Sequence, residues 1–426
     1  MTNRDRRAPL PQGCLVTRVV LIELIEGVVT GFGLVATDAS VGVRLGSFCT
    51  FASFFNWCNL ALMSTHPLTT MTTLINPGAI PDIAKTVYTG DILQGVPVIS
   101  HLGVGDLPPG QKHRFFFQGV EMGTGQHWYV PVVVAVGHRP GPCVGLVAGI
   151  HGDEVSGIDA VQRVMAQLDP QAMAGSVVAV LGVSRPAVEY TRSHWLTAQG
   201  GGSQVDMNRV WPGDETGANA ATRHAGLLWN RLLITNVELV IDYHTVTTGN
   251  DFTLFMFADL RQPTVRQMAE LFPVEQIQND PGLAGTLETA LVEAGIPALT
   301  VEIGGPRRFD AAKIAGAVEG SLNVLKHYGL VSGPLGRTAA TVGTVYGDAL
   351  ETIRATTGGF LELLVDLRDR VTPEQPVALQ RNAFGDVVAE YRAGVTGEVA
   401  VVARDAVCEP GSRVMQILYS RGAESI

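Results

Sequence analysis

The sequence predicts an α/β protein in which helices flank a mixed, largely parallel sheet, with a smaller all-β domain after it. Three observations support this fold class. Short, continuous apolar runs recur between residues 142 and 304, segments with helical spacing separate them, and the composition of the chain changes after residue 332. Buried strands that alternate with helices are typical of a parallel sheet covered on both faces.

The predicted elements of the α/β part follow in chain order. Residues 113–120 and 127–137 are rich in aromatic and β-branched residues, which predicts a pair of strands. Continuous apolar runs predict four buried strands, over 142–150, 176–183, 237–245 and 296–304. Helices are predicted where apolar residues recur at helical spacing or polar segments join these strands, over 155–168, 219–235, 283–295 and 310–328.

The chain divides into three predicted parts. Residues 1–84 form an N-terminal extension of uncertain order, 85–331 the α/β domain and 332–426 the C-terminal β domain, whose short strands are separated by Gly, Pro, Asn and Asp. Residues 45–64 carry no charge, and about 20 such residues could span a bilayer. Ser, Thr, Asn and Cys dilute this stretch, so a membrane anchor is not favoured, and Met71 is a candidate for the true start.

Charge and cysteine usage exclude some classes of partner and site. The formal net charge of the 426 residues is −10, and a phosphate backbone would repel such a chain, so nucleic acid is not expected as a partner. The five cysteines are odd in number and widely spaced, which favours free thiols in a reducing, cytoplasmic compartment over a disulfide framework. A metal would therefore be held by His, Asp or Glu. The sequence leaves open whether the protein forms a homo-oligomer.

Ionisable residues stand where three of the four predicted buried strands end. His151 and Glu154 follow the first strand, His244 closes the third and Glu302 lies near the end of the fourth. Because ligands bind at the carboxyl ends of strands in open α/β sheets, these side chains are expected to converge.

Two histidines and one carboxylate are a familiar ligand set for catalytic zinc, which keeps one position open for water. The His-x-x-Glu spacing of His151 and Glu154 is weak by itself, because surface or capping pairs share it. Likewise, a single histidine such as His244 is more often a core or loop residue. Their common position at predicted strand ends favours one Zn²⁺ per chain.

A further motif, Asp206-Met-Asn208-Arg209-Val-Trp-Pro-Gly213, follows the second buried strand. It resembles the Asp-x-Asn-Arg-x-(aromatic)-Pro-Gly element of zinc carboxypeptidases and their relatives. Together with His-Gly-Asp-Glu, Asp-Tyr-His-Thr and Val-Glu-Ile-Gly-Gly in the same order, the set is similar to the succinylglutamate desuccinylase/aspartoacylase family. The resemblance covers about residues 115–330 and implies a zinc carboxypeptidase-like fold with a β-rich C-terminal domain.

The resemblance implies a role for each matching residue. His151, Glu154 and His244 would hold the zinc ion, and Glu302 would be the general acid/base. Asn208 and Arg209 would grip a substrate carboxylate, for which the planar fork of arginine is well suited. Arg192 would polarise the scissile carbonyl, although the loop 193–205 departs from the compact pattern of the family.

The implied activity is hydrolysis of a small N-acyl amino acid by a zinc-dependent amidohydrolase. One alternative is a metallocarboxypeptidase, because its substrates also present a carboxylate beside an amide. The other is a non-catalytic binding protein on the same fold. The identity of the acyl group and of the amino acid side chain stays open.

Overall fold

The computed structural model describes residues 85–198 and 202–422. The expectations for residues 1–84, including the uncharged stretch 45–64 and the Met71 start, lie outside the described residues. No helix in the described part is long and apolar enough to cross a membrane. Cys143 and Cys408 are buried free thiols.

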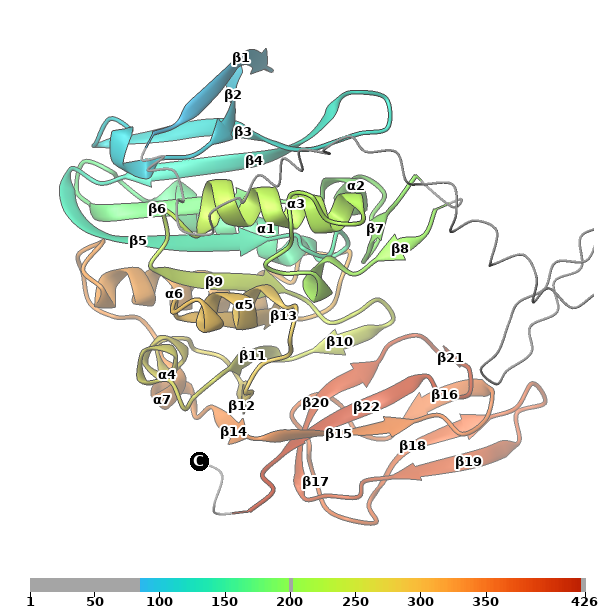
Figure 1. The fold of residues 1–426 in the computed structure, drawn as a ribbon. Helices are drawn as coiled ribbons and strands as arrows, with labels where there is room; N and C mark the ends of the chain where they lie inside the picture. Colours follow the sequence, from blue (N-terminus) through green and yellow to red (C-terminus); the bar gives the residue numbers. More distant parts are fainter. Residues whose placement is uncertain (1–84, 199–201, 423–426) are drawn as a thin grey trace, which may run out of the picture. The chain divides into compact units, whose positions relative to one another are not determined.

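An eleven-stranded sheet organises the described part of the chain (Figure 1). Its order is β1-β2-β3-β4-β6-β5-β9-β13-β11-β12-β14. The bounds along this order are Val87–Leu93, Val96–His101, Gln111–Glu121, His127–Val136, Ala174–Leu181, Arg139–Ala148, Leu239–His244, Ala298–Ile303, Leu254–Ala258, Gln276–Asn279 and Val345–Gly347. The four central strands β6, β5, β9 and β13 are mutually parallel, while β4 and β11 flank them in the antiparallel sense.

Helices cover both faces of this sheet, as the alternation of buried strands and helices predicts. The longer helices are α1 (Val155–Gln167), α3 (Ala220–Leu228), α4 (Pro263–Glu270), α5 (Leu287–Glu293) and α6 (Ala311–His327), and the short ones are α2 (Arg185–Glu189) and α7 (Ala339–Val342). Apolar residues of α1, α4 and α6 form one core with the face that carries Tyr243. Residues of α3 and α5 pack on the opposite face, with Val240. Successive strand residues alternate between faces, so Asp242 and His244 share the side of Val240.

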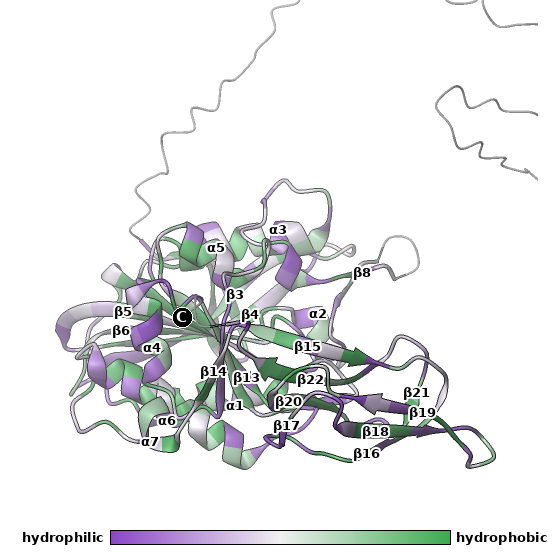
Figure 2. Ribbon diagram, turned by 90° about the horizontal axis from the view of Figure 1, so that it is seen from below, coloured by the Kyte–Doolittle hydropathy of each residue, from purple (hydrophilic) through white to green (hydrophobic). Residues whose placement is uncertain are grey.

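The C-terminal strands build two smaller sheets. One has the order β10-β20-β22-β15, with β17 paired to β20, and the other the order β19-β18-β16-β21. Their bounds are Asn250–Phe252, Gly397–Ala403, Arg413–Tyr419, Ala349–Arg354, Arg370–Val371, Val387–Arg392, Pro376–Arg381, Gly359–Leu363 and Val407–Cys408, in the order in which the strands are named. Figure 2 shows apolar residues along β20 and β22, whose buried side chains form the core between these sheets. A two-stranded ribbon, β7 (Trp195–Leu196) with β8 (Gln204–Val205), lies before the Asp-x-Asn-Arg motif.

The predicted fold class is confirmed, and the four predicted buried strands correspond to β5, β6, β9 and β13. The segment predicted as a helix over 219–235 is α3 followed by a π-helical turn, Trp229–Leu233. The sequence analysis does not predict β10, β11 and β12: β10 and β12 are short and largely polar, and β11 is a five-residue apolar run, LFMFA. The boundary at residue 332 stays a prediction, since β14 beyond it joins the large sheet and β10 before it joins a C-terminal sheet.

Candidate metal and catalytic site

Three predicted metal ligands come together at the carboxyl ends of β5 and β9. His151 lies in the turn after β5, Glu154 is the residue that precedes α1, and His244 is the last residue of β9. The turn between β5 and α1 requires glycine at position 152. A Cβ there would lie 1.9 Å from the backbone carbon of Ala187, so a larger residue would push the ligands out of place.

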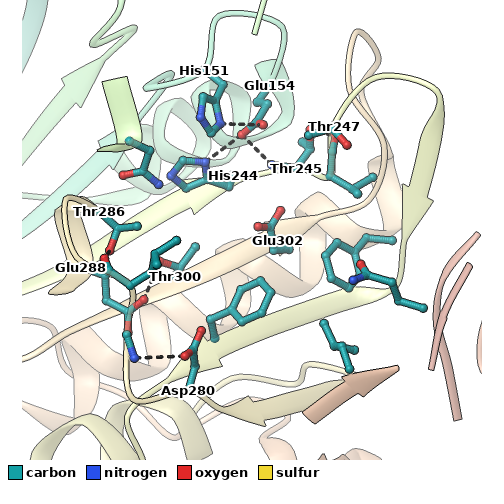
Figure 3. A pocket seen from close by; sticks show the side chains of 18 of the residues that line it. His151, Glu154, His244, Thr245, Thr247, Asp280, Thr286, Glu288, Thr300 and Glu302 are labelled. Atoms are coloured by element: carbon teal, nitrogen blue, oxygen red, sulfur yellow. Dashed lines mark hydrogen bonds and ion pairs between the residues drawn. The ribbon is translucent and has the colours of Figure 1, made fainter. Parts of the chain in front are cut away.

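The three side chains meet through their polar atoms (Figure 3). His151 Nδ1 lies 2.9 Å from Glu154 Oε1, and His244 Nδ1 lies 2.8 Å from Glu154 Oε2. One potential ligand atom from each residue lies within 4.8 Å of the others. The two imidazole rings stand edge to face, with centroids 5.0 Å apart. This arrangement can hold a metal ion, and among the described residues it is the cluster of His, Cys, Asp or Glu with that property.

The second ring nitrogen of each imidazole contacts a further carboxylate. His151 Nε2 lies 3.1 Å from Asp206 Oδ1, and His244 Nε2 lies 3.0 Å from Asp242 Oδ2. A carboxylate that accepts the Nε2 proton leaves the Nδ1 lone pair for a cation, which is the usual support of zinc-binding histidines. Two imidazole nitrogens, one carboxylate and this support fit Zn²⁺.

Burial and mutual attraction determine the charges in this cluster. Burial alone would raise the pKa of Glu154, but the adjoining imidazoles of His151 and His244 lower it to about 2. Burial opposes protonation of His151, but Glu154 and Asp206 raise its pKa to about 9. The carboxylates of Asp242 and Glu154 likewise raise the pKa of His244. Glu154 is thus held as a carboxylate.

Glu302 reaches the same space from the neighbouring strand. It pairs with His244 in the register of β13 and β9, and its Oε2 is buried without a hydrogen-bond partner. Burial and then the nearby Glu154 raise the pKa of Glu302 to about 8. A buried carboxyl that can hold or release a proton near neutral pH suits general acid/base chemistry.

The Asp-x-Asn-Arg motif forms the adjoining wall of the pocket. Asp206 caps the turn by accepting a 2.8 Å hydrogen bond from the backbone N–H of Asn208. The Asn208 side chain accepts a 3.0 Å hydrogen bond from the N–H of Leu287, which ties this wall to α5. Arg209 lines the pocket, and half of its side chain is exposed.

Arg192 is placed differently from the other predicted site residues. Its side chain is exposed and does not line the pocket, while its backbone N–H bonds the carbonyl of Ala187. The role assigned to Arg192 therefore stays a prediction.

The pocket has a volume of about 340 Å³ and extends well beyond the predicted residues. Figure 3 shows Glu302 between the His-Glu-His cluster and Asp280. Residues that sequence reasoning missed line the rest of the cavity, and they include Asp280, Thr286, Glu288, Leu350, Arg413 and Gln416. The first three come from the β12–α5 region and the last three from the C-terminal sheet. No local motif marks these residues, because only the fold brings them to the pocket.

The model of the succinylglutamate desuccinylase/aspartoacylase catalytic domain matches residues 140–328. Over these residues the chain is similar to this family. The matched range contains all of the predicted metal, acid/base and carboxylate-binding residues.

The chain is also similar to individual proteins in sequence and in fold. An N-alpha-acetyl-L-2,4-diaminobutyric acid deacetylase from Halomonas elongata is 28% identical over 283 residues, which are 64% of this chain and 80% of the relative. The product-bound ectoine utilization protein EutE (DoeB) from Ruegeria pomeroyi has a similar fold, with a TM-score of 0.64 and 22% identity over 74% of this chain and 98% of that one. A succinylglutamate desuccinylase/aspartoacylase from Rhodobacter sphaeroides has a TM-score of 0.63 with the same identity and coverage.

Proposed function

We propose that this protein is a zinc-dependent amidohydrolase that removes the acyl group of a small N-acyl amino acid. The observation that carries the proposal is the placement of the His151–Glu154–His244 cluster and the buried carboxyl of Glu302 in one pocket. The family of the catalytic domain and the deacetylase relative support the same class of reaction.

The reaction adds water across an amide, so that the C–N bond breaks to leave a carboxylic acid and an amine. Zinc bound by His151, Glu154 and His244 would supply Lewis-acid polarisation of the scissile carbonyl. Glu302 takes a proton from the attacking water and then delivers it to the leaving nitrogen. Asn208 and Arg209 hold the substrate carboxylate and so fix the amide next to Glu302.

One part of the pocket favours a substrate whose side chain carries an amine. Asp280 and Glu288 line the pocket, and neither forms an ion pair with a cation in the described part of the chain. Burial and the carboxylate of Asp280 raise the pKa of Glu288, so a ligand ammonium group would relieve unfavourable charge there. Thr300, which bonds Glu288, is two residues before Glu302 on β13, a separation of about 6–7 Å along a strand. This separation is similar to the length of a short diamino acid. The Halomonas relative is named for acetylated 2,4-diaminobutyrate.

The test is a release assay on zinc-loaded protein. Nα-acetyl and Nα-succinyl derivatives of 2,4-diaminobutyrate, of its neutral isostere homoserine and of aspartate are offered beside blocked dipeptides, with a chelator and zinc add-back as controls. Chelator-sensitive release from the acyl amino acids, fastest for the diamino acid, is expected. Release from the dipeptides would instead favour the metallocarboxypeptidase. Zinc-loaded protein that binds an acyl amino acid and never releases product would favour the binding protein.

The limited cavity favours the deacylase over the carboxypeptidase. Leu350, Arg413 and Gln416 of the C-terminal sheet line the pocket, whose volume is about 340 Å³. We infer that residues 332–426 act as a separate C-terminal domain that limits the length of the substrate.

A further inference from the structure

Two polar side chains of the C-terminal strand β22 enter the catalytic pocket. Arg413 and Gln416 are three residues apart, so in a regular strand they would point to opposite faces. A β-bulge changes this relationship, because Met415 pairs with Ile353 on β15 and Arg413 pairs with the next residue, Arg354. Val414 is the extra residue, and the bulge turns Arg413 onto the side of Gln416, so that both line the pocket.

Arg413 brings an unused positive charge into this space. Its Nε is buried and has no hydrogen-bond partner, and no ion pair with an acidic side chain is found for it among the described residues. Burial, followed by the nearby guanidinium of Arg354, lowers the pKa of Arg413, whereas the carboxylate of Glu302 acts in the opposite direction. Burying a guanidinium group without a hydrogen-bond partner costs free energy, unless a ligand supplies the missing acceptor.

The side chains around Arg413 either bond other groups or cannot accept a hydrogen bond from it. The Gln416 amide donates a 2.9 Å hydrogen bond to Thr352 Oγ1, and Leu350 is apolar. The charge of Glu302 acts on Arg413, yet no ion pair is found between the two side chains. A ligand in the pocket can therefore supply an acceptor for the Nε–H of Arg413.

We propose that Arg413 is a specificity-determining residue that binds a carboxylate of the substrate. The proposal rests on the proposed function, because it takes the substrate to be an N-acyl amino acid. Two carboxylates could fill this position: the α-carboxylate of the amino acid, shared with Arg209, or a carboxylate at the far end of the acyl chain. Both would form the charge-assisted pairing for which guanidinium is suited.

The test compares Arg413→Gln and Arg413→Lys with the control Arg354→Gln. Arg354 is an adjacent exposed arginine whose Nη1 bonds the carbonyl of Gly411 and which does not line the pocket. Each zinc-loaded protein is given an N-acetyl amino acid, its α-carboxamide and the N-succinyl analogue. For Arg413→Gln we expect kcat/KM to fall about 10- to 100-fold on the substrate whose carboxylate it binds, mostly through KM. Arg413→Lys should recover part of this loss, and Arg354→Gln should match the wild type.

The substrates identify which carboxylate is bound. If wild type and Arg413→Gln differ on the N-acetyl amino acid but not on its α-carboxamide, the α-carboxylate is the ligand. If they differ only on the N-succinyl substrate, the acyl carboxylate is the ligand. An equal effect of Arg413→Gln on all three substrates, or no effect, would overturn the proposal.

A binding measurement keeps this test independent of turnover. Non-hydrolysable N-sulfonyl amino acids, with and without each carboxylate, are titrated calorimetrically into wild type and Arg413→Gln. A charge-dependent loss of affinity in the variant supports the role of Arg413 even if no substrate of the release assay is hydrolysed. Equal affinities of the two proteins for every analogue would refute it, whatever the outcome for the proposed function.

Discussion

Glu302 on β13 lies directly opposite His244 on β9, in the register of two parallel strands. The same register sets Thr300 opposite Asp242, so both strands present their polar residues to one face. The acid/base candidate and a metal-ligand candidate are thus fixed by backbone hydrogen bonds rather than by a loop. Sites supported by rigid elements hold reacting groups more accurately than sites on mobile segments.

Replacing Glu302 by Gln should abolish turnover and leave zinc bound. The amide keeps the size of the side chain but cannot accept and return a proton. We expect kcat to fall by about 10²- to 10⁴-fold. Steady-state kinetics and the zinc content of the purified variant provide the measurement. Turnover at the wild-type rate would remove Glu302 from its assigned role, and loss of zinc would reassign it to the metal site.

Replacing Asp206 by Asn should weaken zinc binding without removing a ligand. Asp206 lies behind His151, and a neutral amide supports the ligand form of the imidazole less well. An affinity loss of about 10- to 100-fold is expected, measured by competition with a chromogenic chelator. Asp214→Asn is the matched control, because the Asp214 carboxylate bonds Thr216 in an exposed turn. Equal zinc affinities of the two variants would contradict the supporting role of Asp206.

Replacing Arg209 by Gln should raise KM more than it lowers kcat. A charged hydrogen bond to the substrate carboxylate contributes about 1.5–3 kcal/mol, or roughly 10- to 100-fold in kcat/KM. The effect should vanish with substrates whose carboxylate is converted to an amide. If the loss is the same for carboxylate and amide substrates, Arg209 does not bind that group.

Arg192→Gln separates a transition-state role from a purely surface position. If Arg192 moves into the pocket when substrate binds, kcat should fall by about 10²- to 10³-fold with little change in KM. This is the outcome that the family resemblance leads us to expect. Unchanged kcat would show that Arg192 stays exposed at the surface and does not stabilise the transition state.

His224 should make the protein lose stability as the pH falls. It is fully buried, and its Nε2 donates to the carbonyl of Val183 at 2.9 Å while its Nδ1 accepts from the N–H of Val120. Burial lowers its pKa from 6.5 to about 4. Between these values the unfolded chain binds a proton that the folded protein does not. The contribution of His224 to the free energy of unfolding is thus fully present above pH 6.5. It declines by about 3 kcal/mol as the pH falls to 4.

Denaturant unfolding of wild type and His224→Gln, at fixed zinc concentration, measures this contribution. Glutamine can still donate to the carbonyl of Val183, but it does not titrate. The free energy of unfolding of His224→Gln should therefore fall less steeply than that of wild type between pH 6.5 and 4. Identical slopes for the two proteins would show that His224 is not the source of the pH dependence.

Local pattern was sufficient to predict the central strands of the fold and to place His151 and His244 at their carboxyl ends. The apolar runs before His151 and His244 are buried strands: β5 ends at Ala148, three residues before His151, and β9 ends at His244 itself. A strand covered on both faces leaves a strong signal in sequence, because every residue along it is apolar. Polar residues at the end of such a strand are therefore conspicuous.

No comparable sequence pattern marks the residues that line the other walls of the pocket. Glu288 lies on a short helix, and only the packing of α5 against β13 brings it near Thr300. Arg413 reaches the pocket through a bulge that reverses the side of one residue, and residue spacing alone would place it on the other face. Both positions depend on contacts between segments that are far apart in the chain.

The contact between Glu154 and His244 would also give a bound metal ion a structural role. These residues are 90 positions apart, and the ligand atoms belong to the ends of two neighbouring strands. An ion held there closes a long loop as a cross-link does, and it binds the folded chain in preference to the unfolded one. Thermal stability should consequently rise with the logarithm of the free zinc concentration, so the supply of metal would govern the lifetime of the protein as well as its activity.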